Sequence, residues 1–399
     1  MMQAGGKASL AVSGQGKVAG SMGTTDRAEL TAWLRLLLTP RLGSAACRAL
    51  LAGLGSPQAV FEADPRALAA WLKPADLARI QVVPPQLADA VEQTLLWLAA
   101  ATADSPRAVL SLGDPAYPSA LLDLADPPLL LFAQGRLGLL LNPAVAVVGS
   151  RSPTAQGHDN AQAFALALSQ SGVTVVSGLA QGVDGAAHEG ALDGQGGSTI
   201  AVVGTGLDRV YPKEHLELAH RIAREGLMLS EFPLGTPPRP GHFPKRNRLV
   251  AALSRGTLVV EAALQSGSLI TARLAAELGR EVLAIPGSIH SPQARGCHAL
   301  IKQGAKLVET AQDVLEELNW AQPQHSTQTG SSEDGLEDEG EDAVDPLLRA
   351  MGYDPVSQEA LSARTGMGPA ELGARLLELE LLGQVARLPG ALYQRVGLS

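Results

Sequence analysis

Six short apolar runs alternate with helical stretches between residues 105 and 320, and no other feature of the chain restricts its fold as much. The runs are rich in Val, Ile, Leu and Ala and lie near 144–148, 173–177, 199–203, 227–232, 257–261 and 281–285. Helical patterns separate or follow them near 154–171, 183–192, 213–225, 269–278 and 311–318. Apolar strands spaced by single helices indicate a mostly parallel sheet with helices on both faces. We therefore expect an α/β fold over 105–320.

The segments on either side of this region differ in composition. Residues 1–25 are rich in Gly, Ser and Ala and predict a disordered extension, while 26–100 carry helical patterns broken by Pro and Gly. Residues 321–345 are polar and acidic and predict a flexible linker. Residues 346–399 predict a winged helix, with three helices and a hairpin near 346–351, 357–365, 369–382 and 384–396.

The net charge of −9 hides an uneven distribution. Eight acids and no base lie between Ser331 and Asp345, whereas residues 232–260 contain five bases and no acid. The acidic total therefore does not exclude a polyanionic partner at the basic stretch.

Two cysteines, Cys47 and Cys297, are too few for a disulfide framework or a four-ligand zinc site, and neither a signal peptide nor a membrane span is evident. We expect a cytoplasmic protein without a metal or other cofactor.

Three of the expected strands end in glycine-rich turns, at Gly149, Gly178 and Gly204. In open α/β sheets, ligands bind outside the carboxyl ends of the strands, where glycines let backbone amides approach a phosphate. Neither a complete dinucleotide fingerprint nor a Gly-x4-Gly-Lys-Ser/Thr loop is present. The glycines could serve only tight turns, but Arg151, shortly after the first of them, favours an anion site.

The segment His242-Phe243-Pro244-Lys245-Arg246-Asn247-Arg248 combines an aromatic ring with three cations. Single-stranded nucleic acid needs both, because a ring stacks on a base of any sequence and cations neutralise phosphates. The alternative is a solvated charged turn with Phe243 buried in the core. The lack of acids nearby favours binding, since surface stretches usually mix both signs.

The sequence gives little evidence for a catalytic site. The eight histidines are scattered, and none has metal-ligand spacing with another. His188 follows Asp184 by four residues, which places both on one helix face and favours capping or packing over catalysis. Ser266, Ser268 and Thr271 lie at a helix start, where hydroxyls cap the helix or hold a phosphate, and no base is placed to activate them.

Nine short motifs, in order between about residues 110 and 310, strongly resemble the DprA/Smf family of DNA-processing proteins. They are Val148-Gly149-Ser150-Arg151, Ser177-Gly178-x-Ala180-x-Gly182-x-Asp184-x-x-Ala187-His188, Gly204-x-Gly206-x-Asp208-x-x-Tyr211-Pro212, Ser230-Glu231-Phe232-Pro233, Phe243-Pro244-x-Arg246-Asn247-Arg248, Glu261-Ala262, Ser266-Gly267-Ser268-x-Ile270-Thr271-Ala272, Gly279-Arg280 and Pro286-Gly287.

This resemblance implies an extended Rossmann fold that binds single-stranded DNA without catalysis. Members of the family protect incoming strands during natural transformation, displace single-strand-binding protein and help to load RecA recombinase, usually as homodimers. By the same resemblance, residues 26–100 are similar to a SAM-like or helix-hairpin-helix module, and 346–399 to the winged helix of some members. The winged helix carries five bases and five acids, which favours protein interaction or regulation over duplex binding.

The resemblance also assigns DNA contacts. Arg151 would hold a phosphate, Phe243 would lie against a base, and Lys245, Arg246 and Arg248 would line the pocket. The complete expected set is Gly149, Ser150, Arg151, Ser177, Gly178, Phe243, Lys245, Arg246, Asn247, Arg248, Gly267 and Thr271.

Two other classes of function stay open. The extended Rossmann scaffold also serves phosphoribohydrolases similar to the LOG family, whose Pro-Gly-Gly-x-Gly-Thr-x-x-Glu loop is absent at the comparable turn, 265–271. The second alternative is a regulator that binds duplex DNA through the winged helix.

The chain departs from the DprA/Smf pattern at Gly296-Cys297-His298, where Gly-x-Asn is common, so the hydrogen bonding of His298 is open.

Overall fold

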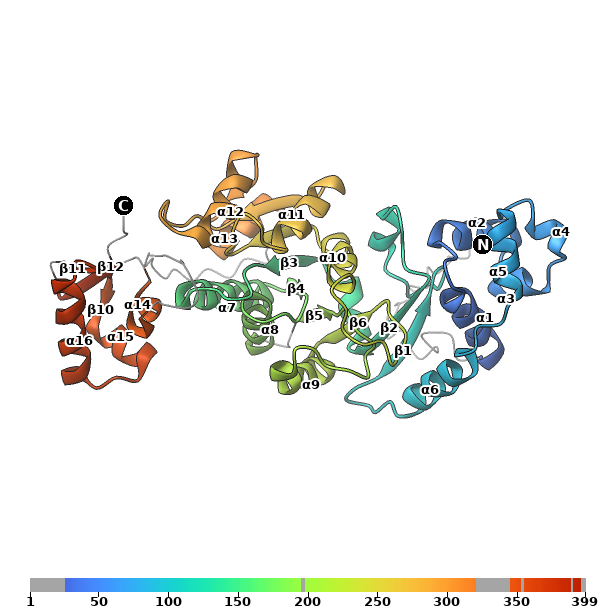
Figure 1. Ribbon diagram of the computed structural model, residues 1–399, viewed down its shortest axis with the longest axis horizontal. Coiled ribbons are helices and arrows are strands. Elements are labelled where there is room, and N and C mark those ends of the chain that lie inside the picture. The colour runs from blue at the N-terminus through green and yellow to red at the C-terminus, as the bar shows by residue number, and fades with distance from the viewer. Residues whose placement is uncertain (1–25, 195–197, 321–344, 353–354, 389, 396–399) are drawn as a thin grey trace, which may run out of the picture.

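The structure is a computed structural model that describes residues 26–194, 198–320, 345–352, 355–388 and 390–395. A nine-stranded sheet with its helices occupies the middle of the molecule, with the N-terminal helices at one end and a small C-terminal domain at the other (Figure 1). The predicted α/β fold with a winged helix is confirmed. The predicted extension 1–25 and the predicted linker, apart from Asp345, lie outside the described residues. Within the described ranges, no helix has both the length and the apolar character needed to span a membrane.

The central sheet has the strand order β1-β2-β6-β5-β4-β3-β7-β8-β9. Strands β1 and β2 pair antiparallel with each other, β2 pairs antiparallel with β6, and all other pairs are parallel. The strands are β1 (Arg107–Ser111), β2 (Leu130–Gly135), β3 (Ala144–Val148), β4 (Thr174–Ser177), β5 (Thr199–Val202), β6 (Leu227–Ser230), β7 (Gly256–Val259), β8 (Glu281–Ala284) and β9 (Lys306–Leu307). The predicted strands correspond to β3 to β8 within two residues at each end, whereas β1, β2 and β9 are additions.

Helices cover both faces of this sheet. They are α7 (Ala155–Gln170), α8 (Val183–Asp193), α9 (Leu216–Glu225), α10 (His242–Ala252), α11 (Ser268–Glu277), α12 (Pro292–Lys302) and α13 (Ala311–Glu317), with short 3-10 turns η1 (Ser119–Asp123), η2 (Leu137–Leu141) and η3 (Lys213–His215). The sequence did not predict α10 or α12. Helix α10 begins with a polar segment that has no apolar periodicity and carries Pro244 in its first turn, where proline is tolerated.

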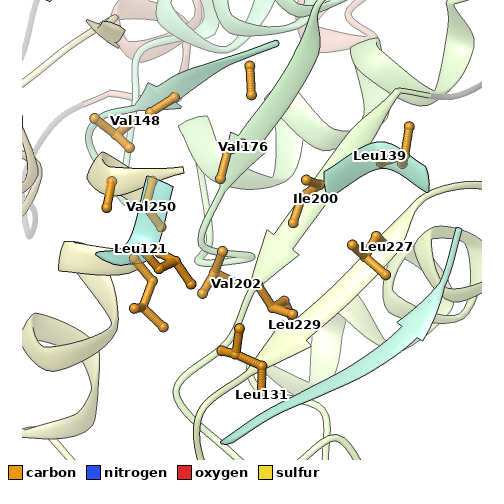
Figure 2. Close-up of a cluster of buried hydrophobic side chains, with 14 of the residues drawn as sticks. Leu121, Leu131, Leu139, Val148, Val176, Ile200, Val202, Leu227, Leu229 and Val250 are labelled. Atoms are coloured by element: carbon orange, nitrogen blue, oxygen red, sulfur yellow. The ribbon is translucent and has the colours of Figure 1, made fainter. Parts of the chain in front are cut away.

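Strand residues alternate between two cores, as the period of two in a strand requires. In β3, Ala146 and Val148 face the core under α10, α11 and α12, whereas Val145 and Val147 face the core under α7, α8 and α13. Figure 2 shows the first of these cores, where Val148, Val176, Ile200, Val202 and Leu229 of neighbouring strands gather with Val250 of α10.

The N-terminal helices share a core with the β1–β2 hairpin. They are α1 (Arg27–Leu38), α2 (Ser44–Leu54), α3 (Pro57–Glu62), α4 (Pro65–Leu68), α5 (Pro74–Gln81) and α6 (Leu87–Ala99), of which the sequence predicts the first, second and last. Val109, Leu130 and Phe132 point into this helical core, whereas Leu110 and Leu131 point to the core of the central sheet. The hairpin is therefore buried on both faces, which explains why it shows no polar alternation.

The C-terminal domain is a winged helix as predicted. It consists of α14 (Pro346–Met351), α15 (Gln358–Thr365), α16 (Pro369–Leu381) and a small sheet of β10 (Val356–Ser357), β12 (Leu392–Arg395) and β11 (Val385–Leu388). Asp345, which the sequence places in the linker, caps α14 by accepting a hydrogen bond from the Leu347 amide at 2.8 Å.

Candidate functional site

The cleft that holds most of the expected site residues lies where the strand order of the sheet reverses. From β3 the chain builds β4, β5 and β6 on one side and then returns to place β7 on the other. Such a switch point leaves a crevice outside the carboxyl ends of the strands. A cleft of about 560 Å³ occupies this place. It is lined by nine of the twelve expected contact residues, namely Gly149, Ser150, Arg151, Gly178, Phe243, Arg246, Asn247, Gly267 and Thr271.

The loop after β3 forms one wall of the cleft. A side chain at Gly149 would lie 2.9 Å from the Glu261 carbonyl oxygen, so glycine is needed for the loop to approach the end of β7. The Ser150 amide donates to that carbonyl at 2.7 Å. The next residue, Arg151, points an exposed guanidinium over the Phe243 ring, 5.7 Å from its centroid. None of the ion pairs among the described residues includes Arg151, so this cation is available to an anion.

The N-terminus of α7 does not serve the cleft as an anion site, because a carboxylate already occupies it. Glu261 accepts hydrogen bonds from the Thr154 amide at 3.0 Å and from its hydroxyl at 2.7 Å. Gly157 leaves room for this carboxylate, since an added Cβ would lie 2.3 Å from it. In the sequence, Glu261 stands out only as part of a motif and as the first acid after a long acid-free stretch.

The loop after β4 is held by a buried pair of opposite charges. The Asp184 carboxylate accepts from the Gly178 amide at 3.1 Å and the Ala180 amide at 3.3 Å. Arg246 is buried, donates to the Val202 carbonyl at 2.7 Å and fills the space where Gly178 would carry a side chain. Burial raises the pKa of Asp184 and lowers the pKa of Arg246, and the attraction between the two groups opposes both shifts. The Asp184 carboxylate therefore stabilises the loop after β4.

Helix α10 supplies the aromatic wall of the cleft. Phe243, Asn247 and Val250 recur at helical spacing and line the cleft together. The Phe243 ring is only partly buried, so it is neither a core residue nor a freely exposed one. Its ring centroid lies 5.5 Å from that of Tyr211, and it packs closely against the backbone at Gly204.

Two of the expected lining cations lie outside this cleft. Lys245 and Arg248 point away from Phe243, because residues two and five positions along a helix fall on its other side. Both pair with Glu231, whose Oε2 lies 3.0 Å from Lys245 Nζ and 2.7 Å from Arg248 Nη2. These three residues line a separate cavity of about 150 Å³ against the N-terminal helices, together with Leu36, Leu37, Leu42, Ser44, Cys47, Pro127, Pro128 and Leu129.

Ser177 is also outside the cleft. Its side chain is fully buried, and its hydroxyl donates to the Val147 carbonyl at 2.6 Å. The hydroxyl therefore ties β4 to β3 and cannot reach a ligand.

The N-terminus of α11 forms the opposite wall. Gly267, Ser268 and Thr271 line the cleft there, and the hydroxyls of Ser266 and Ser268 lie 2.7 Å apart. The first amides of a helix have no partner within the helix and attract anions. Arg151, Arg246 and Asp184 are the ionisable residues of the cleft lining. The cleft thus combines a net positive charge, the N-terminus of a helix and one aromatic face.

The cleft lining contains no histidine, and His188 and His298 have structural contacts elsewhere. His188 is buried with its Nδ1 2.7 Å from the Thr199 hydroxyl oxygen, and burial lowers its pKa to about 3. His298, where the sequence departs from the family pattern, places Nε2 2.8 Å from the Gly287 carbonyl oxygen. Within the ranges that the structure describes, no three His, Cys, Asp or Glu residues gather as metal ligands do.

Comparison with known proteins agrees with this geometry. The family model for DNA recombination-mediator protein A matches residues 108–319, and the model for the DprA winged helix domain matches 331–391. Protein Smf of Escherichia coli is 41% identical over 305 residues, which cover 75% of this chain and 79% of that protein. DNA processing protein DprA of Streptococcus pneumoniae is 50% identical over 210 residues, or 53% of this chain and 74% of that protein. The X-ray structure of DprA from Streptococcus pneumoniae aligns with a TM-score of 0.62 and 38% identity, covering 74% of this chain and 99% of that one.

Proposed function

Since this chain belongs to the DprA/Smf family, we propose that it binds single-stranded DNA in the cleft at the switch point of the sheet and acts in DNA processing without catalysis. The observation that carries the proposal is Arg151, a cation without an ion pair among the described residues, lying over the partly exposed Phe243 ring in a cleft of positive charge. A ring beside a free cation is the combination that binds a base and its phosphate.

The groups in the cleft favour binding over chemistry. Asp184 holds backbone amides, and the serine hydroxyls at the start of α11 contact each other with no histidine in the lining. A nucleophilic hydroxyl needs a neighbouring base within hydrogen-bond distance. A phosphoribohydrolase activity therefore has little support from these side chains.

We further propose the partners that the family resemblance implies: RecA recombinase, single-strand-binding protein and a second copy of the chain, in the cytoplasm during natural transformation. The sheet edge at β9 supports the homodimer, because Leu307 is 42% exposed there and an edge strand can pair with another chain.

We propose protein interaction or regulation for the winged helix. In α16, Arg375 pairs with Asp345 and Glu378, while Leu377 and Leu381 are exposed. Binding in the major groove of DNA requires a basic helix face, which α16 does not have.

The experiment that tests the proposal compares binding of a fluorescent oligothymidylate, the matching duplex and free nucleotides by the full-length protein. We expect tighter binding to the single strand than to the duplex, no nucleotide hydrolysis, and faster RecA filament growth on strands coated with single-strand-binding protein. Equal or tighter duplex binding would favour a duplex regulator, and release of base or phosphate from a nucleotide would favour an enzyme.

A further inference from the structure

Tyr211 is an exposed aromatic residue next to the cleft. The chain has only five Phe and four Tyr. Among the described residues, Trp71 and Tyr211 are the aromatic residues with the largest exposure, 46% and 48%, and of these Tyr211 contacts a residue of the cleft. An exposed ring beside a binding cleft offers a flat apolar face to a ligand.

The loop that carries Tyr211 is tied to its surroundings on both sides. The Gly206 amide donates to the Thr236 carbonyl at 3.1 Å, and the Gly235 amide donates to the Asp208 carboxylate at 2.8 Å. Closer to the cleft, His242 Nδ1 lies 3.0 Å from the Gly204 carbonyl oxygen. The His242 contact holds Gly204 against the start of α10, and the other two bonds hold residues 206–208 against 235–236, so the backbone that leads to Tyr211 is fixed near Phe243.

The two rings are in contact and form an angled surface. Their centroids lie 5.5 Å apart and their planes are inclined by 40°. Rings at this distance already pack against each other, which leaves no space for a base between them. A base can reach only the outer face of each ring, so the pair can support two neighbouring bases, one on each residue.

We propose that Tyr211 is a second base-stacking residue, so that the site holds two consecutive nucleotides, one base on Phe243 and the next on Tyr211. This inference rests on the proposed binding of single-stranded DNA and adds a nucleotide subsite outside the cleft lining. Because every base has a flat aromatic face, the subsite selects for a stacked base and tolerates any sequence.

The test is an abasic scan of the full-length protein and its variants. The probe is the shortest oligothymidylate that keeps full affinity for the unchanged protein, in a series with one abasic position each. Tyr211→Ala, Tyr211→Phe and Phe243→Ala are compared, with Leu216→Ala as the matched control, because Leu216 is similarly exposed, at 44% against 48%, and lies five residues further along the chain. Melting temperatures verify that each variant is folded.

We expect two adjacent abasic positions to weaken binding by the unchanged protein. Tyr211→Ala should weaken binding of the intact strand by about 5- to 140-fold and remove the penalty at one of these positions only, while Phe243→Ala removes it at the other. Tyr211→Phe and Leu216→Ala should leave both penalties in place.

Two results would overturn the inference. An abasic profile of Tyr211→Ala that matches the unchanged protein would mean that Tyr211 contacts no base. Loss of the penalty at the Phe243 position as well would mean that Tyr211 only supports Phe243. If Arg151→Ala and Phe243→Ala also bind normally, the proposed function itself fails, which is a different outcome from failure of the Tyr211 subsite alone.

Discussion

Replacement of Phe243 by Ala separates a base-stacking role from a packing role. Inside the protein, the substitution removes the ring pair with Tyr211, worth about 0.5–1.5 kcal/mol, and the Arg151 guanidinium's interaction with the ring, worth about 0.5–1 kcal/mol. We therefore expect the free energy of unfolding to fall by about 1–2.5 kcal/mol. The loss of stacking on a base should weaken single-strand binding by about 1–3 kcal/mol, a change in Kd of about 5- to 140-fold.

The assays are urea unfolding and fluorescence anisotropy with an oligothymidylate, each on Phe243→Ala, Phe243→Trp and Phe164→Ala. Phe164 is the matched control, since it is buried in the core under α7 and away from the cleft. Its replacement should cost about 3–5 kcal/mol of stability and leave the Kd of the folded protein unchanged. Phe243→Trp should retain binding because its larger ring still accepts a base. A Phe243→Ala protein that loses 3–5 kcal/mol of stability and keeps its Kd would refute the stacking role.

Three further predictions concern charged and titratable groups. If the strand makes three or four phosphate contacts, log K should fall with log salt with a slope of about −2 to −3, and Arg151→Ala should flatten that slope by about 0.7; an unchanged slope and affinity would assign Arg151 a structural role. Glu231→Gln should cost about 1–3 kcal/mol in urea unfolding because Arg248, with a side chain only 13% exposed, loses its nearest carboxylate and keeps only Asp126, 3.8 Å away; adding Arg248→Met should recover most of this, and failure to do so would contradict the pairing argument. The pKa of His188 is lowered to about 3 by burial, so the unfolded chain binds an extra proton below about pH 6.5 and stability should fall from pH 6.5 to pH 5; the fall should be smaller in His188→Gln, and an equal fall would show that other groups cause it.

Much of the fold follows from strand and helix periodicity, and the exceptions have physical causes. The alternation of apolar runs with helices predicts β3 to β8 and, through the ends of these strands, the place of the cleft. The β1–β2 hairpin, whose residues are buried alternately in two cores, was not predicted. Helix α10 was not predicted because a helix that lines a cleft has functional side chains where apolar ones normally recur.

The same helix explains which site residues could not be predicted. In a linear motif Lys245, Arg246 and Arg248 look equivalent, but the helical period directs Arg246 to the floor of the cleft and the other two to Glu231. Glu231 precedes them in the chain by more than a dozen residues, and only the pairing of β6 within the sheet brings it opposite α10. Tyr211 likewise stands in a recognised motif, yet its contact with Phe243 exists only in three dimensions.

The burial of the β1–β2 hairpin on two faces has a consequence for synthesis on the ribosome. The N-terminal helices leave the ribosome first, but their core contains Leu130 and Phe132 and stays open until the hairpin has been made. The hairpin in turn pairs with β6, at residues 227–230, so the edge of β2 gains its partner strand only after about a hundred further residues have been translated. At about 5–20 residues per second this leaves an unpaired strand edge exposed for about five seconds or longer. We expect nascent chains that end before β6 to be the forms of this protein that most require chaperones.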